Sequence, residues 1–215
     1  MTDIRATFLA AGRAAVDLLA RPEVAARWDQ PSSLPHFTVG GLAGHLARAV
    51  TTVEGYLDRE EPPAGDVVTA AGYYHAALGP SGAVDLDSDL HTAVRRRGEE
   101  AAAGGPEAVA GALRDLLARM EGRLADEPGT RRIGVLHGLT LSLDDYLVTR
   151  VVELVVHMDD LAVSLDLPAP EPPAEAATVT IDALVRLARL RHGDLAVVRA
   201  LARRERAAAG VLNVL

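Results

Sequence analysis

The chain has 215 residues, a length that suits one domain with an appendage or two small domains. Its formal net charge of −8 argues against nucleic acid as a partner, because an acidic surface repels a phosphate backbone. It contains no cysteine, which excludes disulfides, thiolate metal ligands and a thiol nucleophile of its own. Any thiol chemistry therefore needs a thiol brought in from outside.

The apolar residues of the first half recur with helical spacing. We expect a first helix after Thr2 that is interrupted at Pro22, followed by an irregular, proline-containing connector over residues 28–37. Thr38 is a typical N-cap for a second helix, which Pro62 and Pro63 end. The next helices are expected at about residues 66–78 and 87–103, and a clearer one from Pro106 to the Pro128-Gly129 pair.

The second half is expected to be helical after a short extended stretch at residues 132–136. Ser142 is a good N-cap, and the strongly apolar helix that follows is expected to run unbroken to Pro168. A proline-rich linker and two terminal helices, about residues 174–191 and 194–208, come next, with a short strand or tail at the end. These elements predict an all-α bundle over residues 1–167 and a small appendage over residues 168–215.

Targeting segments are not expected. No apolar run reaches the roughly 20 residues of a membrane span, and the N-terminus lacks the continuous apolar stretch of a signal peptide. We therefore expect a cytoplasmic protein with no membrane partner. Exposed leucines and valines on the terminal helices are compatible with a homodimer.

A carboxylate and an imidazole lie side by side on the most apolar helix. Glu153 and His157 are four residues apart and share one helix face among leucines and valines. A buried ionised glutamate costs several kcal/mol unless something neutralises it. A metal ion does so, and so does a simple ion pair between the two residues.

His45 favours the metal ion over the ion pair, because it too interrupts an otherwise apolar helical face. Two such anomalies in two helices suggest one shared cause. Two histidines and one glutamate form a recognised zinc set that leaves a fourth position open, as in catalytic sites. Zinc is the expected ion, although histidine and glutamate sites also accept nickel, iron or manganese.

Two segments resemble the signatures of a known family. Residues 28–49, with the pattern WxxPSSLPxFTVGxLAGHLARA, and residues 149–162, TRVVELVVHMDDLA, are similar to the two motifs of the mycothiol-dependent maleylpyruvate isomerase family. The resemblance covers roughly residues 5–165 and includes short, actinobacterial-type members. It implies a DinB-like four-helix bundle that binds zinc through His45, Glu153 and His157, with mycothiol as the thiol cosubstrate.

The resemblance implies an enzyme with a small-molecule thiol and a small electrophile as its partners. The expected activity is thiol-dependent S-transfer or isomerisation, because a metal lowers the pKa of a bound thiol. Characterised isomerases carry a sizeable α/β C-terminal domain, whereas only about forty residues follow the linker here, which argues against maleylpyruvate itself as substrate. Two alternatives are a non-catalytic metal-binding bundle with a stress-response or regulatory ligand-binding role, and a bundle without metal.

Three further residues near the predicted site each have two alternative roles. Arg150 is assigned to cofactor or substrate binding, where it either orients Glu153 or meets an anion, and a structural ion pair with Asp144 or Asp145 is the alternative. Asp160 either accepts the second ring N–H of His157 or lies exposed at the helix end. His137 either lines the pocket or lies on a surface loop.

Overall fold

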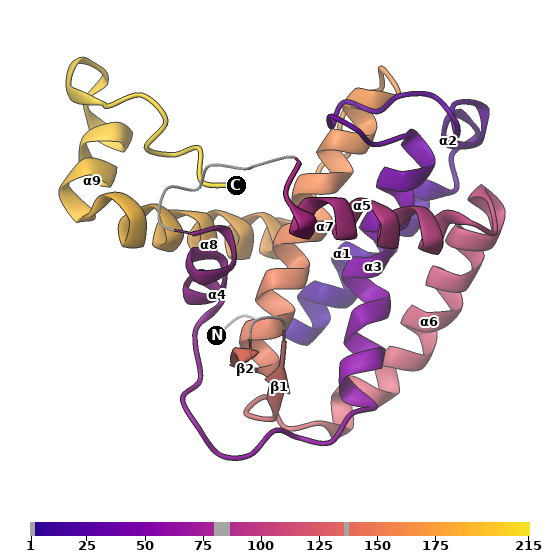
Figure 1. The fold of residues 1–215 in the computed structure, drawn as a ribbon, viewed down its shortest axis with the longest axis horizontal. Helices are drawn as coiled ribbons and strands as arrows, with labels where there is room; N and C mark the ends of the chain where they lie inside the picture. The colour runs from indigo at the N-terminus through magenta and orange to yellow at the C-terminus, as the bar shows by residue number, and fades with distance from the viewer. Residues whose placement is uncertain (1–2, 80–86, 136–137) are drawn as a thin grey trace.

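A computed structural model describes residues 3–79, 87–135 and 138–215 of the chain (Figure 1). In chain order the helices are α1 (Ile4–Leu19), α2 (Pro22–Ala26), α3 (Val39–Leu57), α4 (Ala70–Leu78), α5 (Asp89–Ala102), α6 (Pro106–Asp126), α7 (Leu143–Ser164), α8 (Ala174–His192) and α9 (Asp194–Ala202). The strands β1 (Arg132–Gly134) and β2 (Thr140–Ser142) form an antiparallel pair before α7, and the 3-10 turn η2 (Arg204–Arg206) follows α9. The predicted all-α class is confirmed. Within the described ranges, none of the helices combines the length and the apolar character that crossing a membrane requires.

Helices α1, α3, α6 and α7 form the four-helix bundle of the predicted DinB-like fold. Each packs against two neighbours in the ring α1, α7, α3, α6, and their apolar faces make one continuous core. The largest fully buried side chains of these helices include Phe8, Leu42, Leu46, Leu113, Met120 and Leu154. Burial of each such side chain contributes about 1.5–3 kcal/mol, so the bundle is a stable frame for whatever its polar residues do.

Side-chain caps begin the helices that carry the predicted site. The hydroxyl of Thr38 accepts a hydrogen bond from the Gly41 amide at 2.9 Å, and that of Ser142 accepts one from the Asp145 amide at 3.0 Å. Both contacts satisfy an amide that has no partner within its own helix. The predicted starts of α3 and α7 are therefore confirmed.

The predicted ends of two helices, α7 and α9, are wrong. Helix α7 ends at Ser164 rather than at Pro168, because Asp166 adopts a left-handed conformation (φ 54°) and the residue before a proline disfavours the helical region. The predicted interruption at Pro22 is confirmed, because α1 ends at Leu19 and Pro22 begins α2, where its missing N–H costs nothing. Helix α9 ends at Ala202, since Arg203 turns to an extended conformation at the start of an arginine run whose like charges disfavour a continued helix.

Helix α5 lies across α3 (Figure 1) and touches it backbone to backbone. A Cβ atom built on Gly44 would collide with the carbonyl oxygen of Gly98, and one built on Gly98 would lie 2.7 Å from the carbonyl oxygen of Gly41. Only glycine permits this approach. The crossing places α5 directly beside His45, whose Cβ would be 3.4 Å from that added Cβ of Gly98.

Helix α8 packs on α4 and α7 and builds a second, smaller core (Figure 1). Its buried members are Ala71, Tyr74, Val152, Ala183, Leu187, Ala188, Val197, Val211 and Val214. The last five residues form a turn and an irregular tail rather than a strand. Val211 and Val214 of this tail are buried. Helix α4 is thus held between the bundle and the C-terminal segment.

Candidate metal centre

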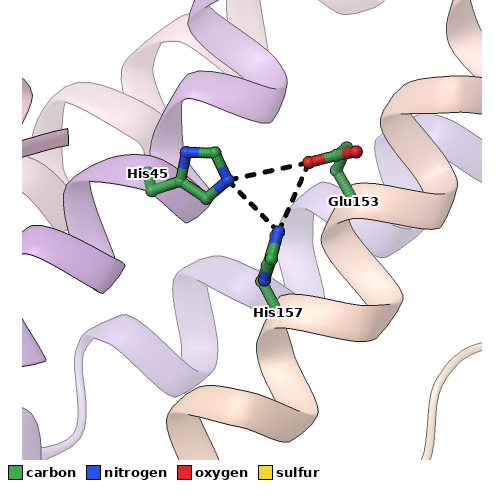
Figure 2. A group of neighbouring side chains, drawn as sticks. All are labelled: His45, Glu153 and His157. Atoms are coloured by element: carbon green, nitrogen blue, oxygen red, sulfur yellow. Dashed lines mark hydrogen bonds and ion pairs between the residues drawn. The ribbon is translucent and has the colours of Figure 1, made fainter. Parts of the chain in front are cut away.

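The three predicted ligands converge between α3 and α7 (Figure 2). The Nε2 atoms of His45 and His157 are 3.2 Å apart. The Oε2 atom of Glu153 lies 3.7 Å from His45 Nε2 and 3.3 Å from His157 Nε2. Their side chains are only 18–22 % exposed. Residues more than a hundred positions apart in sequence therefore present three donor atoms to one point.

Helix geometry explains the convergence. Glu153 and His157 lie one turn apart on α7, so their side chains share the face that meets α3. Tyr146, further toward the start of α7, donates a hydrogen bond at 2.9 Å to the Oγ1 atom of Thr52, further toward the end of α3. The two helices consequently run antiparallel along this contact, which brings His45 opposite the glutamate and histidine pair.

Two further side chains fix the orientation of these groups. The Nδ1 atom of His157 lies 2.9 Å from Asp160 Oδ2, so of the two alternatives for Asp160 the structure shows the contact with the ring, and Nε2 points toward the centre. The hydroxyl of Tyr74 lies 2.9 Å from Glu153 Oε1 and 3.0 Å from the Thr149 carbonyl oxygen. Oε1 is thereby occupied, which leaves Oε2 to face the histidines.

The electrostatics show a carboxylate balanced by one imidazolium. Burial opposes ionisation of Glu153, but hydrogen bonds from the two histidines and the charge of Arg150 outweigh it and hold its pKa well below the usual range. Burial lowers the pKa of His157, yet its hydrogen bonds to Asp160 and Glu153 raise it more, to about 9. Burial lowers the pKa of His45, and its contact with Glu153 does not compensate. His45 is therefore neutral at pH 7.

The donor set fits a tetrahedral cation. Donor atoms bound at about 2.0–2.1 Å to one zinc ion are about 3.3–3.4 Å from each other, close to the three separations given above. The Nδ1 atom of His45 is buried and has no hydrogen-bond partner among the described residues. Coordination through Nε2 would leave this atom without a partner as well, so the donor separations, and not Nδ1, are what support a metal.

A pocket opens onto the three donor atoms. It has a volume of about 460 Å³, and its lining includes His45, Glu153 and His157 together with residues of α3, α4, α5 and α7. This volume lies within the range of small-molecule sites. The centre is therefore accessible to a ligand of moderate size rather than sealed inside the bundle.

The remaining predicted residues have the following positions. Arg150 lines the pocket, where its guanidinium stacks 5.0 Å from the centre of the Tyr146 ring and its Nε donates a hydrogen bond to Thr149 Oγ1 at 3.1 Å. Within the described ranges it forms no ion pair with Asp144 or Asp145. His137 lies outside the described residues.

Sequence reasoning missed Tyr74 of α4, which contacts Glu153, one of the three predicted ligands. That helix has a weak apolar pattern, and its only sequence signal is the N-cap Thr69, whose hydroxyl accepts a hydrogen bond from the Gly72 amide at 3.2 Å. The approach of Tyr74 to Glu153 depends on the packing of α4 against α7 and α8, which no local pattern encodes.

We expect Tyr74→Phe to weaken metal binding about tenfold, because partners that orient a ligand typically contribute 10–100-fold to affinity. The measurement is competition with a chromophoric chelator. Tyr73→Phe is the matched control, since Tyr73 lines the same pocket but its hydroxyl has no hydrogen-bond partner among the described residues. Equal affinities for the two variants would contradict the orienting role of Tyr74.

Comparisons with known proteins give one match. A family model described as the mycothiol maleylpyruvate isomerase N-terminal domain matches residues 8–162, a span that contains all three converging side chains. No curated protein and no solved structure matches the chain significantly.

Proposed function

The chain belongs to the family of the mycothiol maleylpyruvate isomerase N-terminal domain, and from this premise we propose that it is a metal-dependent enzyme. It uses a low-molecular-weight thiol, mycothiol, for S-transfer to a small electrophile or for isomerisation of one. The observation that carries the proposal is the convergence of His45, Glu153 and His157 at the wall of a pocket.

We assign the metal to His45 Nε2, Glu153 Oε2 and His157 Nε2, with zinc as the preferred ion. Three protein ligands leave room for a further ligand from the pocket, as in catalytic rather than structural zinc sites. A divalent metal bound there lowers the pKa of a coordinating thiol and so maintains a thiolate at neutral pH. The cosubstrate then supplies the thiol group, which the cysteine-free chain itself lacks.

The protein's own residues orient the proposed ligands and shield them from water. Asp160 holds the ring of His157 with Nε2 toward the centre, and Tyr74 holds Glu153 with Oε2 in the same direction. Phe37 packs against the His45 ring, with 5.8 Å between the ring centres, and limits access of water from that side. These contacts keep the donor atoms in place before a ligand arrives, which reduces the cost of reorganisation.

The proposed chemistry is nucleophilic addition of the thiolate to an electrophilic carbon. The sulfur lone pair forms the C–S bond, while the displaced electron pair leaves with a leaving group or moves onto an electron-accepting group of the substrate. Loss of a leaving group completes S-transfer. Alternatively, rotation about the former double bond and expulsion of the same thiolate complete an isomerisation, which regenerates the thiol.

The test combines metal analysis with turnover. We expect about one divalent metal ion per purified chain, and loss of thiol consumption when mycothiol is incubated with chlorodinitrobenzene and the chelated protein. Restoration by zinc would support the proposal. Metal-loaded protein that neither binds mycothiol nor consumes it would refute the enzyme and leave a non-catalytic bundle.

A further inference from the structure

Three arginines line the pocket without an acidic partner. Arg48 from α3, Arg97 from α5 and Arg150 from α7 all contribute to its wall. In the part of the chain that the structure describes, no carboxylate lies within 4.0 Å of any of their guanidiniums, although most other arginines of the bundle form ion pairs. Among the described residues, Glu153 is the one Asp or Glu side chain that lines the pocket, and it already contacts the two histidines and Tyr74.

The backbone places two of these charges toward one end of the metal centre and the third on the neighbouring helix α5. Arg48 follows His45 by three residues and Arg150 precedes Glu153 by three, so each lies one turn from a proposed ligand. Because α3 and α7 run antiparallel, both turns lie toward the same end of the contact. Arg97 is next to Gly98, which is held against α3 by the glycine crossing.

The rest of the pocket is apolar and aromatic. All four tyrosines of the chain line it, at positions 56, 73, 74 and 146. Leu34, Phe37 and Val94 add aliphatic and aromatic surface. Such a lining favours a ligand with an apolar or aromatic body, while the guanidiniums are suited to bind carboxylates in a bidentate manner.

We propose that Arg48, Arg97 and Arg150 form an anion subsite that binds the carboxylate of an organic acid whose apolar or aromatic body fills the tyrosine-lined part of the pocket. This inference names the substrate class of the proposed function and rests on it for the role of the acid as electrophile. An unsaturated aromatic acid that bears its reactive carbon beside the carboxylate satisfies both requirements.

The charge balance supports an anionic ligand. Burial lowers the pKa of Arg48, and the neighbouring charges of Arg97 and Arg150 lower it further, so the charged form of Arg48 is disfavoured where it lies in the pocket wall. A carboxylate among them relieves this repulsion. In a chain with a net charge of −8, a pocket lined by three arginines is a local feature, not a consequence of overall charge.

The experiment measures binding of cinnamate and of its neutral amide, cinnamamide, by calorimetry to zinc-loaded and to chelator-treated protein. We expect cinnamate to bind at least about tenfold more tightly than cinnamamide, and more tightly than acetate or inorganic phosphate, in both preparations. Equal affinity for acid and amide, or tighter binding of phosphate than of cinnamate, would overturn the proposal. Anion binding to a protein that takes up no metal would support this inference and refute the proposed function separately.

Variants locate the subsite. We expect Arg48→Gln and Arg97→Gln each to weaken cinnamate binding about tenfold or more and to leave cinnamamide binding within twofold. Arg114→Gln on α6 is the matched control, because Arg114 is exposed and does not line the pocket. Unchanged cinnamate affinity in both pocket variants would overturn the assignment. Since the amide reports on the integrity of the pocket, a folding defect is distinguished from loss of the charge.

Discussion

In the His45→Ala variant we expect the bound metal to fall from about one ion per chain to a small fraction of that value. His45 is the one proposed ligand that α3 supplies, and the two α7 residues cannot enclose a cation without it. Loss of a direct ligand should exceed the 10–100-fold effect of losing an orienting partner, so the affinity should drop at least about a hundredfold. Elemental analysis after dialysis against equimolar zinc measures this outcome.

The control for this prediction is His192→Ala, which removes an exposed imidazole from the end of α8. We expect it to retain stoichiometric zinc. The assignment of the ligands is wrong if His45→Ala also retains one zinc per chain with unchanged affinity. Circular dichroism of both variants separates loss of the ion from loss of the fold.

The Gly44→Ala variant should be destabilised by about 3 kcal/mol. The added methyl group would occupy the space of the Gly98 carbonyl oxygen, and a backbone atom cannot move aside as the end of a flexible side chain does. Overpacking typically costs 1–3 kcal/mol, and a backbone collision belongs at the upper end of that range. Urea unfolding monitored by circular dichroism gives the free energy of unfolding.

Gly55→Ala on the same helix is the matched control and should raise the free energy of unfolding instead of lowering it. An added Cβ at Gly55 meets no atom within 4 Å, so the substitution gains helix propensity without a collision. We expect it to stabilise the protein by about 0.5–1 kcal/mol. Equal effects of the two substitutions would show that the glycine crossing does not constrain α3 against α5.

Much of the bundle could be predicted because its signals are local. The apolar periodicity and the caps at Thr38 and Ser142 identified α3 and α7 and their starting residues. The placement of Glu153 and His157 on one face followed from their spacing alone. The convergence of His45 with them was an inference from two polar interruptions of apolar helices, and the geometry of the three side chains agrees with it (Figure 2).

The rest depends on tertiary packing. Tyr74 reaches Glu153 only because α4 is held between α7 and α8, and Arg97 reaches the pocket only because the glycine crossing draws α5 onto α3. Arg97 is the third residue of an arginine run at positions 95–97, a pattern that is typical of a solvated helix face, yet it lines the pocket. Sequence periodicity reports which face of a helix is apolar, but it does not report which partner covers that face.

The position of Tyr74 in the second core has a consequence for exchange of backbone hydrogens. Tyr74 packs with Ala183, Leu187 and Val197 while its hydroxyl contacts Glu153, so α4 joins the metal centre to the C-terminal helices. Any local opening that frees α4 must also release this contact. A cation that prefers the closed arrangement should therefore slow deuterium uptake by amides of α4 and α8, although neither helix supplies a proposed ligand. By reciprocity, damage to the packing of α8 should lower affinity at the cation site.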